Sequence, residues 1–171
     1  FTTPAEVAAH EAEVEATAGS LLKLYDQGKL ERVRNADEIT KNIKWLTGQQ
    51  RPKLLARERL VAAGEYAMPQ LLQALLQRKD QELSAEVMRL MIDMGEQAVI
   101  PLCIAMTSLD PNGQEQVADI LGQIQHKPAL PFLFDVMGST KAPTVKAACE
   151  RAINRIGRTQ ITDTADLYQD L

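Results

Sequence analysis

The chain has 171 residues, of which 45 % are hydrophobic but only 4 % aromatic, and its formal net charge is −4. This aliphatic, alanine-rich composition favours helices packed on helices and argues against a β-sandwich or barrel. No apolar run approaches the roughly 18 residues of a membrane span. Two cysteines are too few for a disulfide scaffold or a four-thiolate metal site. The acidic net charge gives no general reason to expect nucleic acid as a partner.

The first part of the chain, residues 1–50, predicts an N-terminal helical cap. A capping box at its start begins one helix over residues 3–28, whose polar face is acidic. A second helix, over residues 35–48, has Asn35 as its N-cap. The apolar residues that we expect this second helix to bury are Ile39, Ile43 and Leu46.

The two ends of the chain predict that it is a segment of a larger protein. It begins with Phe1 rather than Met, and no signal-peptide pattern occurs in the first thirty positions. The cytoplasm is therefore slightly favoured over export with a removed signal. Residues 163–171 predict a short separate helix with Asp163 as its N-cap.

From Pro52 onward the sequence repeats with a period of about 30 residues. Each copy contains a helix, a turn, a proline and a second helix, and we expect the proline to open the second helix. The apolar residue that closes the first helix is found at Ala63, Met94, Ile124 and Ile156. A glycine follows in three copies, because the chain reverses there and needs a left-handed residue. The third copy has Gln125 instead, and we expect its turn to depend on Pro128.

The stretch 92–104, with the sequence IDMGEQAVIPLCI, resembles the HEAT repeat in its short bacterial form, A..AL..IG...AVP.L...L. The resemblance covers about residues 52–157 and implies an all-α fold, an α-α superhelix of antiparallel helix pairs. We expect three HEAT-like pairs and the first helix of a fourth, in a right-handed solenoid over residues 51–171 that follows the cap. Such solenoids mostly serve as scaffolds and partner-binding surfaces.

No motif in the sequence points to catalysis, a metal or a cofactor. His10 lies on the acidic helix beside two glutamates, but no second imidazole or thiolate completes a ligand set. His126 falls in a turn. Cys103 and Cys149 occupy core positions of non-adjacent repeats, so we expect two buried thiols and no disulfide. We therefore predict that the chain is not an enzyme and binds no cofactor or metal.

The predicted partner is a protein or peptide, bound on the second helices, which the resemblance places on the concave side. Counted from each proline, the residues expected to face the core are Leu71, Leu72, Cys103, Ile104, Leu133 and Phe134. The residues expected to face outward are Gln70, Gln73, Leu102, Ala105, Phe132 and Asp135. Leu102 and Phe132 either form an apolar strip for a peptide or pack against neighbouring second helices.

The alternative function is a HEAT module that binds the backbone of a nucleic acid. Residues 29–60 carry a net charge of +5, whereas residues 1–28 carry −4. The cations that could contact phosphates are Lys41, Lys44, Arg51, Lys53, Arg57 and Arg59. These side chains are predicted to point several ways, and the acidic first helix is an available partner for them. We therefore favour a protein-binding scaffold and expect the cations to be solvated or paired internally.

Overall fold

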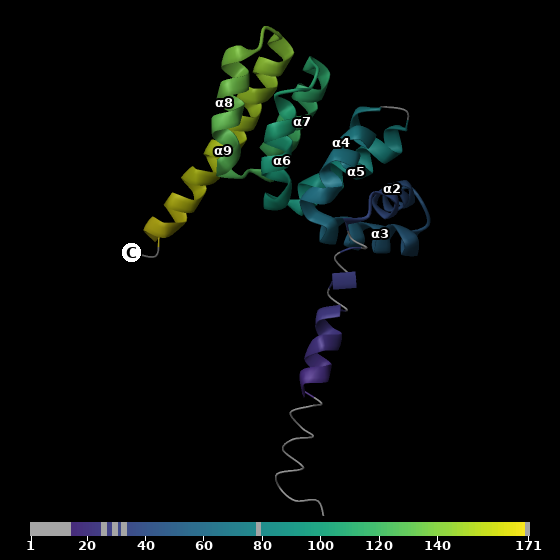
Figure 1. Cartoon of the computed structure of the whole chain (residues 1–171). Coiled ribbons are helices and arrows are strands. Elements are labelled where there is room, and N and C mark those ends of the chain that lie inside the picture. The colour runs from purple at the N-terminus through teal and green to yellow at the C-terminus, as the bar shows by residue number, and fades with distance from the viewer. Residues whose placement is uncertain (1–14, 25–26, 29–30, 32–33, 78–79, 170–171) are drawn as a thin grey trace, which may run out of the picture.

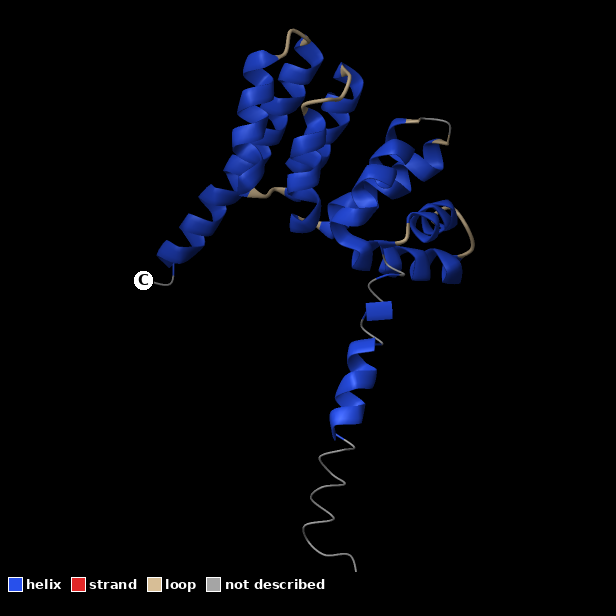
Figure 2. Cartoon of the chain, viewed as in Figure 1, coloured by secondary structure: helices blue, strands red, loops and turns tan. Residues whose placement is uncertain are grey.

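The structure is a computed structural model that describes residues 15–24, 27–28, 31, 34–77 and 80–169, with residues 158–169 described as backbone only. Figure 2 shows that this part of the chain is helical and contains no strand, which confirms the all-α expectation. After the helical residues 15–24, the helices are α2 (Ala36–Trp45), α3 (Gln50–Ala63), α4 (Met68–Leu76), α5 (Gln81–Met94), α6 (Glu96–Met106), α7 (Pro111–Ile124), α8 (Leu130–Ser139) and α9 (Pro143–Gln169). Two short 3-10 helices precede α4 and α8, namely η1 (Gly64–Ala67) and η2 (Lys127–Ala129). In the described part, no helix is both long and apolar enough to cross a membrane.

The helices form two layers. In the even layer, α2, α4, α6 and α8 contact one another in chain order, and in the odd layer α3, α5, α7 and α9 do the same. The closest packing between the layers joins α2 to α3, α4 to α5, α6 to α7 and α8 to α9 (Figure 1). The described part of the solenoid thus contains four helix pairs. Each second helix of the predicted repeats packs chiefly on the helix that follows it.

Two of these tight turns depend on glycine. Gly64 and Gly95 have φ angles of 56° and 57° with ψ angles of −130° and −125°, a conformation that L-residues rarely adopt. In the third turn Gln125 has φ 58° and ψ 33°, which is the left-handed region that other residues can enter. An additional residue, His126, follows Gln125 before η2 begins. The left-handed residue of this turn is therefore Gln125. Pro128, on which the turn is predicted to depend, lies after it inside η2.

Gly95→Ala is expected to reduce the free energy of unfolding by about 1–3 kcal/mol, because alanine is strained at this φ and ψ. A Cβ at position 95 would meet no atom within 4 Å, so the loss would come from the backbone alone. Urea unfolding measures the effect. The control is Gly138→Ala, where the space is also open and φ is not positive. Equal stability of the Gly95→Ala and unchanged chains would contradict the role of this glycine.

A buried alanine sets the register of the even-layer helices. Ala67, Ala98 and Ala129 are fully buried and recur every 31 residues. Four residues after each alanine comes a buried leucine, at Leu71, Leu102 and Leu133. Six residues after each alanine comes an exposed residue, at Gln73, Ile104 and Asp135. At these positions α4, α6 and α8 turn equivalent residues toward the core and toward solvent, but the position between the last two differs, since Cys103 is buried and Phe134 is exposed.

The register counted from the prolines is wrong in α6. Two residues separate Ala98 from Pro101, whereas one residue separates alanine and proline in the other two copies. One additional residue rotates the positions by about 100°. Leu102, expected to face outward, is therefore only 1 % exposed, and Ile104, expected in the core, is 62 % exposed. Pro101 also lies inside α6 and does not open it.

In α4 and α8 the expectations are partly correct. Leu71 and Leu133 are buried as predicted, and so is Cys103 in α6. Phe134, predicted in the core, is 52 % exposed, while Leu72 and Phe132 are partly buried and pack against the core. Phe134 follows the buried Leu133 by one position, and this step of about 100° takes it out of the core.

The predictions for the two ends of the chain are confirmed in part. Asn35 caps α2 as expected, because its side chain accepts hydrogen bonds from the backbone N–H groups of Asp37 and Glu38. The three apolar residues predicted for this helix are buried. No separate helix begins at Asp163, since Gly157 takes no positive φ and α9 continues through it. Much of the predicted helix over 3–28, including His10, lies outside the described residues, and the boundary of the cap at residue 50 stays a prediction.

Candidate protein-binding face

Three helices of the even layer, α4, α6 and α8, are poor in charge, whereas α2 of the same layer carries four charged residues. Helices α4, α6 and α8 together contain only two charged side chains, Glu96 and Asp135. By contrast, α3 alone contains five and α5 contains four. Depletion of charged residues distinguishes the centre of a protein interface from the rest of a protein surface.

Three large apolar side chains are exposed on this charge-poor surface. Ile100 and Ile104 lie one turn apart on α6, and Phe134 lies on α8. These two helices contact each other, so the three residues belong to neighbouring parts of one layer. We call Ile100, Ile104 and Phe134 the apolar face. Exposed apolar side chains that occur together, rather than singly, are typical of binding surfaces.

The structure separates the six residues predicted to bind a partner into three groups. Gln73 and Asp135 are exposed. Gln70, Ala105 and Phe132 are partly buried, and Gln70 accepts a hydrogen bond of 3.1 Å from the Thr40 hydroxyl of α2. Leu102 lies in the core and is unavailable to a partner. The apolar face is absent from the sequence-based prediction, although the alanine register would have found Ile104.

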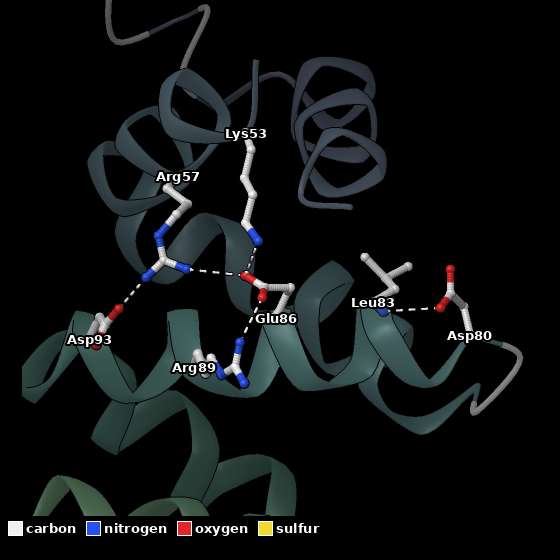
Figure 3. A network of polar contacts seen from close by, with 7 residues as sticks. All are labelled: Lys53, Arg57, Asp80, Leu83, Glu86, Arg89 and Asp93. Carbon is white, nitrogen blue, oxygen red and sulfur yellow. Dashed lines mark hydrogen bonds and ion pairs between the residues drawn. The ribbon is translucent and has the colours of Figure 1, made fainter. Parts of the chain in front are cut away.

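Part of the predicted basic stretch is paired with carboxylates between α3 and α5 (Figure 3). The buried Glu86 of α5 lies 2.9 Å from Lys53, 3.6 Å from Arg57 and 2.8 Å from Arg89. Arg57 also pairs with Asp93. The hydrogen bond and the charge of Lys53, with the charges of Arg89 and Arg57, lower the pKa of Glu86 although burial opposes this.

The other cations of the stretch lie on α2 and α3. Lys41 is 3.7 Å from Glu38 and lies over the Trp45 ring. Within the described part of the chain, Lys44, Arg51 and Arg59 have no ion-pair partner. The expectation of internal pairing is thus confirmed for Lys41 and for the two cations that contact Glu86. In the described part of the chain, their carboxylate partners come from α2 and α5.

The lowered pKa of Glu86 predicts a specific pH dependence of stability. Since its pKa is lowered on folding, this carboxylate stabilises the fold at pH values above its ordinary pKa of 4.5. The contribution is lost as the pH falls through the lowered pKa of the folded state. We expect Glu86→Gln to be less stable than the unchanged chain at about pH 7, with the difference shrinking toward about pH 3. Urea midpoints across this range measure it. Glu96→Gln, at an exposed position, is the control, and an unchanged difference at low pH would contradict the assignment.

The cysteines and the described histidine show no catalytic arrangement. Cys103 and Cys149 are free and buried, as predicted. Burial raises the pKa of Cys103 to about 11, and burial and the charge of Asp119 raise that of Cys149, which keeps both thiols protonated at neutral pH. The Nε2 atom of His126 lies 3.6 Å from the exposed Glu96.

A comparison with protein families supports the repeat architecture. A family model described as HEAT repeats matches residues 68–161, which is more than half of the chain and runs from the start of α4 into α9. No curated protein and no solved structure matches the chain.

Proposed function

Because the chain belongs to the HEAT repeat family, we propose that it is a non-enzymatic module that binds a protein segment on the outer surface of its even layer. HEAT repeats generally mediate protein–protein interaction or scaffolding, and the family is typically non-catalytic. The observation that carries the proposal is the apolar face on helices that are otherwise almost free of charge. Gln73 and Asp135 lie at equivalent exposed positions and would border the bound segment.

The proposed partner segment is an amphipathic helix with basic flanks. Ile100 and Ile104 are one helical turn apart on α6, and Phe134 on the neighbouring helix α8 makes the apolar face wider. The only charges on α4, α6 and α8 are the carboxylates of Glu96 and Asp135, which favour cationic flanks on the partner. An apolar helix stripe laid on such a surface is a recurring mode of peptide recognition.

A synthetic amphipathic helix of leucine and lysine tests the proposal. Fluorescence anisotropy of the labelled peptide should show binding that Ile104→Asn and Phe134→Asn each weaken about tenfold, because each substitution removes an apolar anchor. Leu54→Asn is the matched control, since Leu54 is exposed on α3 in the odd layer. A leucine–glutamate peptide should bind more weakly. Equal binding by all variants, or by both peptides, would contradict the proposal.

The nucleic-acid alternative has support only from Lys44, Arg51 and Arg59, the cations without an ion pair in the described part. We expect no binding to generic duplex DNA at low salt, because the carboxylates of α2 and α5 already neutralise the other cations of the stretch. Titration at about 20 mM and 200 mM salt measures this. Binding that weakens steeply as salt rises would favour the alternative, and its loss in an Arg51→Ala, Arg59→Ala double variant would assign the site.

A further inference from the structure

In the part of the chain that the structure describes, one side of α3 has no neighbour in the odd layer. Helix α3 buries three residues, whereas α5 and α7, of the same length, bury five and six. Lys53 and Arg57 of α3 face Glu86 of α5. Leu55 is two positions from each of these cations, about 200° around the helix, and therefore lies on the side of α3 opposite α5. It is 42 % exposed, so an apolar side chain occupies the uncovered end of the odd layer.

The helix over residues 15–24 has an apolar stripe that is also uncovered. Leu21, Leu22 and Leu24 are 62–64 % exposed. Figure 1 shows this helix, in purple, projecting away from the helix pairs. Because even-layer and odd-layer helices alternate along the chain, the helix that precedes α2 is the next candidate for the odd layer, and the open position there is the one beside α3.

Two exposed arginines border the Leu55 side of α3. Arg51 and Arg59 flank Leu55 by one turn on either side, both are exposed, and neither has an ion-pair partner in the described part. The sequence of residues 1–28 contains five carboxylates and the single cation Lys23. Helix 15–24 itself carries only Glu15 and Lys23, so most of these carboxylates lie outside it and the docking depends on the leucines.

The chain can reach the surface within one molecule. The Arg34 guanidinium lies 4.4 Å from the centre of the Tyr66 ring in η1, which holds the chain at the C-terminal end of α3. The ten residues from Leu24 to Arg34 can span at most about 35 Å. Helix α3, with 14 residues, is about 21 Å long. A helix that runs back along α3 from this point is therefore within reach.

We propose that helix 15–24 docks through its leucines on the Leu55 side of α3 in the same molecule and closes the odd layer. The docked helix shields the apolar end of the solenoid, as terminal elements of repeat proteins must do for the chain to stay soluble. The surface is separate from the apolar face on α6 and α8, which remains available to a partner.

Hydrogen exchange tests the docking. The amides of residues 15–24 should exchange at least about tenfold more slowly than in an isolated peptide of the same sequence, and Leu55→Asp should abolish this protection. Leu54→Asp is the matched control, because Leu54 is exposed on the same helix about 100° away from Leu55 and should preserve the protection. Unchanged protection of α5 to α9 shows that the variants remain folded. Unprotected amides in the unchanged chain, or equal effects of the two substitutions, would overturn the proposal.

Cross-linking distinguishes docking within one molecule from exchange between two. A chain with Leu21→Cys and Leu55→Cys should give a monomeric product with a short bismaleimide, since the native thiols of Cys103 and Cys149 are buried. The same treatment of a Leu21→Cys, Leu54→Cys chain should give much less. A cross-linked dimer, or no product at either position, would overturn docking within the molecule.

Discussion

Leu102→Asp is expected to unfold the chain, whereas Ile104→Asp should leave it folded. Leu102 is among the largest fully buried side chains, and an unpaired carboxylate at its position would cost several kcal/mol, a large part of a typical domain's stability. Ile104 is only two residues away on the same helix, but its side chain is mostly in water. The two variants therefore make a matched pair with opposite outcomes.

Far-UV circular dichroism and thermal unfolding would distinguish the two variants. Leu102→Asp should show a greatly reduced helix signal, or an unfolding temperature well below that of the unchanged chain. Ile104→Asp should unfold within a few degrees of the unchanged chain. If Leu102→Asp were as stable as Ile104→Asp, the register set by the buried alanines would be wrong. The proposed apolar face would then be wrong as well.

Gly122→Ala is expected to destabilise the chain by about 1–3 kcal/mol through overpacking between α7 and α9. A Cβ at Gly122 would lie 2.8 Å from the Ala152 Cα and 3.0 Å from its Cβ. The first of these atoms belongs to the backbone, so no side-chain rotation can relieve the contact. The two helices make the closest contact in the odd layer, and they would have to move apart.

Two further variants make the Gly122 prediction specific. Gly157→Ala places the same methyl group in α9, where nothing lies within 4 Å, and should be neutral or stabilising by up to about 1 kcal/mol. Adding Ala152→Gly to Gly122→Ala removes the Ala152 Cβ but not its Cα, and should restore part of the lost stability. Urea midpoints of the four chains measure these effects. Equal midpoints for Gly122→Ala and Gly157→Ala would contradict the close approach of the two helices.

The candidate face shows how a small error in register changes a functional prediction. The prediction from the sequence selected the proline-containing helices α4, α6 and α8, and two of its outward residues, Gln73 and Asp135, are exposed. It selected Leu102 over Ile104 because the proline of α6 is displaced by one residue relative to the buried alanine. A proline is tolerated at several positions near a helix start. An alanine in a close helix contact has no such freedom, since any larger side chain would collide with the neighbouring helix.

The sequence by itself determined the features that depend on local backbone chemistry and on periodicity. These are the all-α class, the period of about 30 residues, the Asn35 cap and the glycines at positions 64 and 95. Each depends on residues within a few positions of one another, so the information is present in a short stretch of chain.

Only the tertiary structure decided which residues meet across the layers. Glu86 contacts Lys53 and Arg57 from more than 28 positions away, and Gly122 meets Ala152 at a similar separation. The rotation of each helix about its axis selects these partners, and one additional residue changes that rotation by about 100°. For this reason the helices could be predicted from the sequence, whereas the contacts of Glu86 and of Gly122 could not.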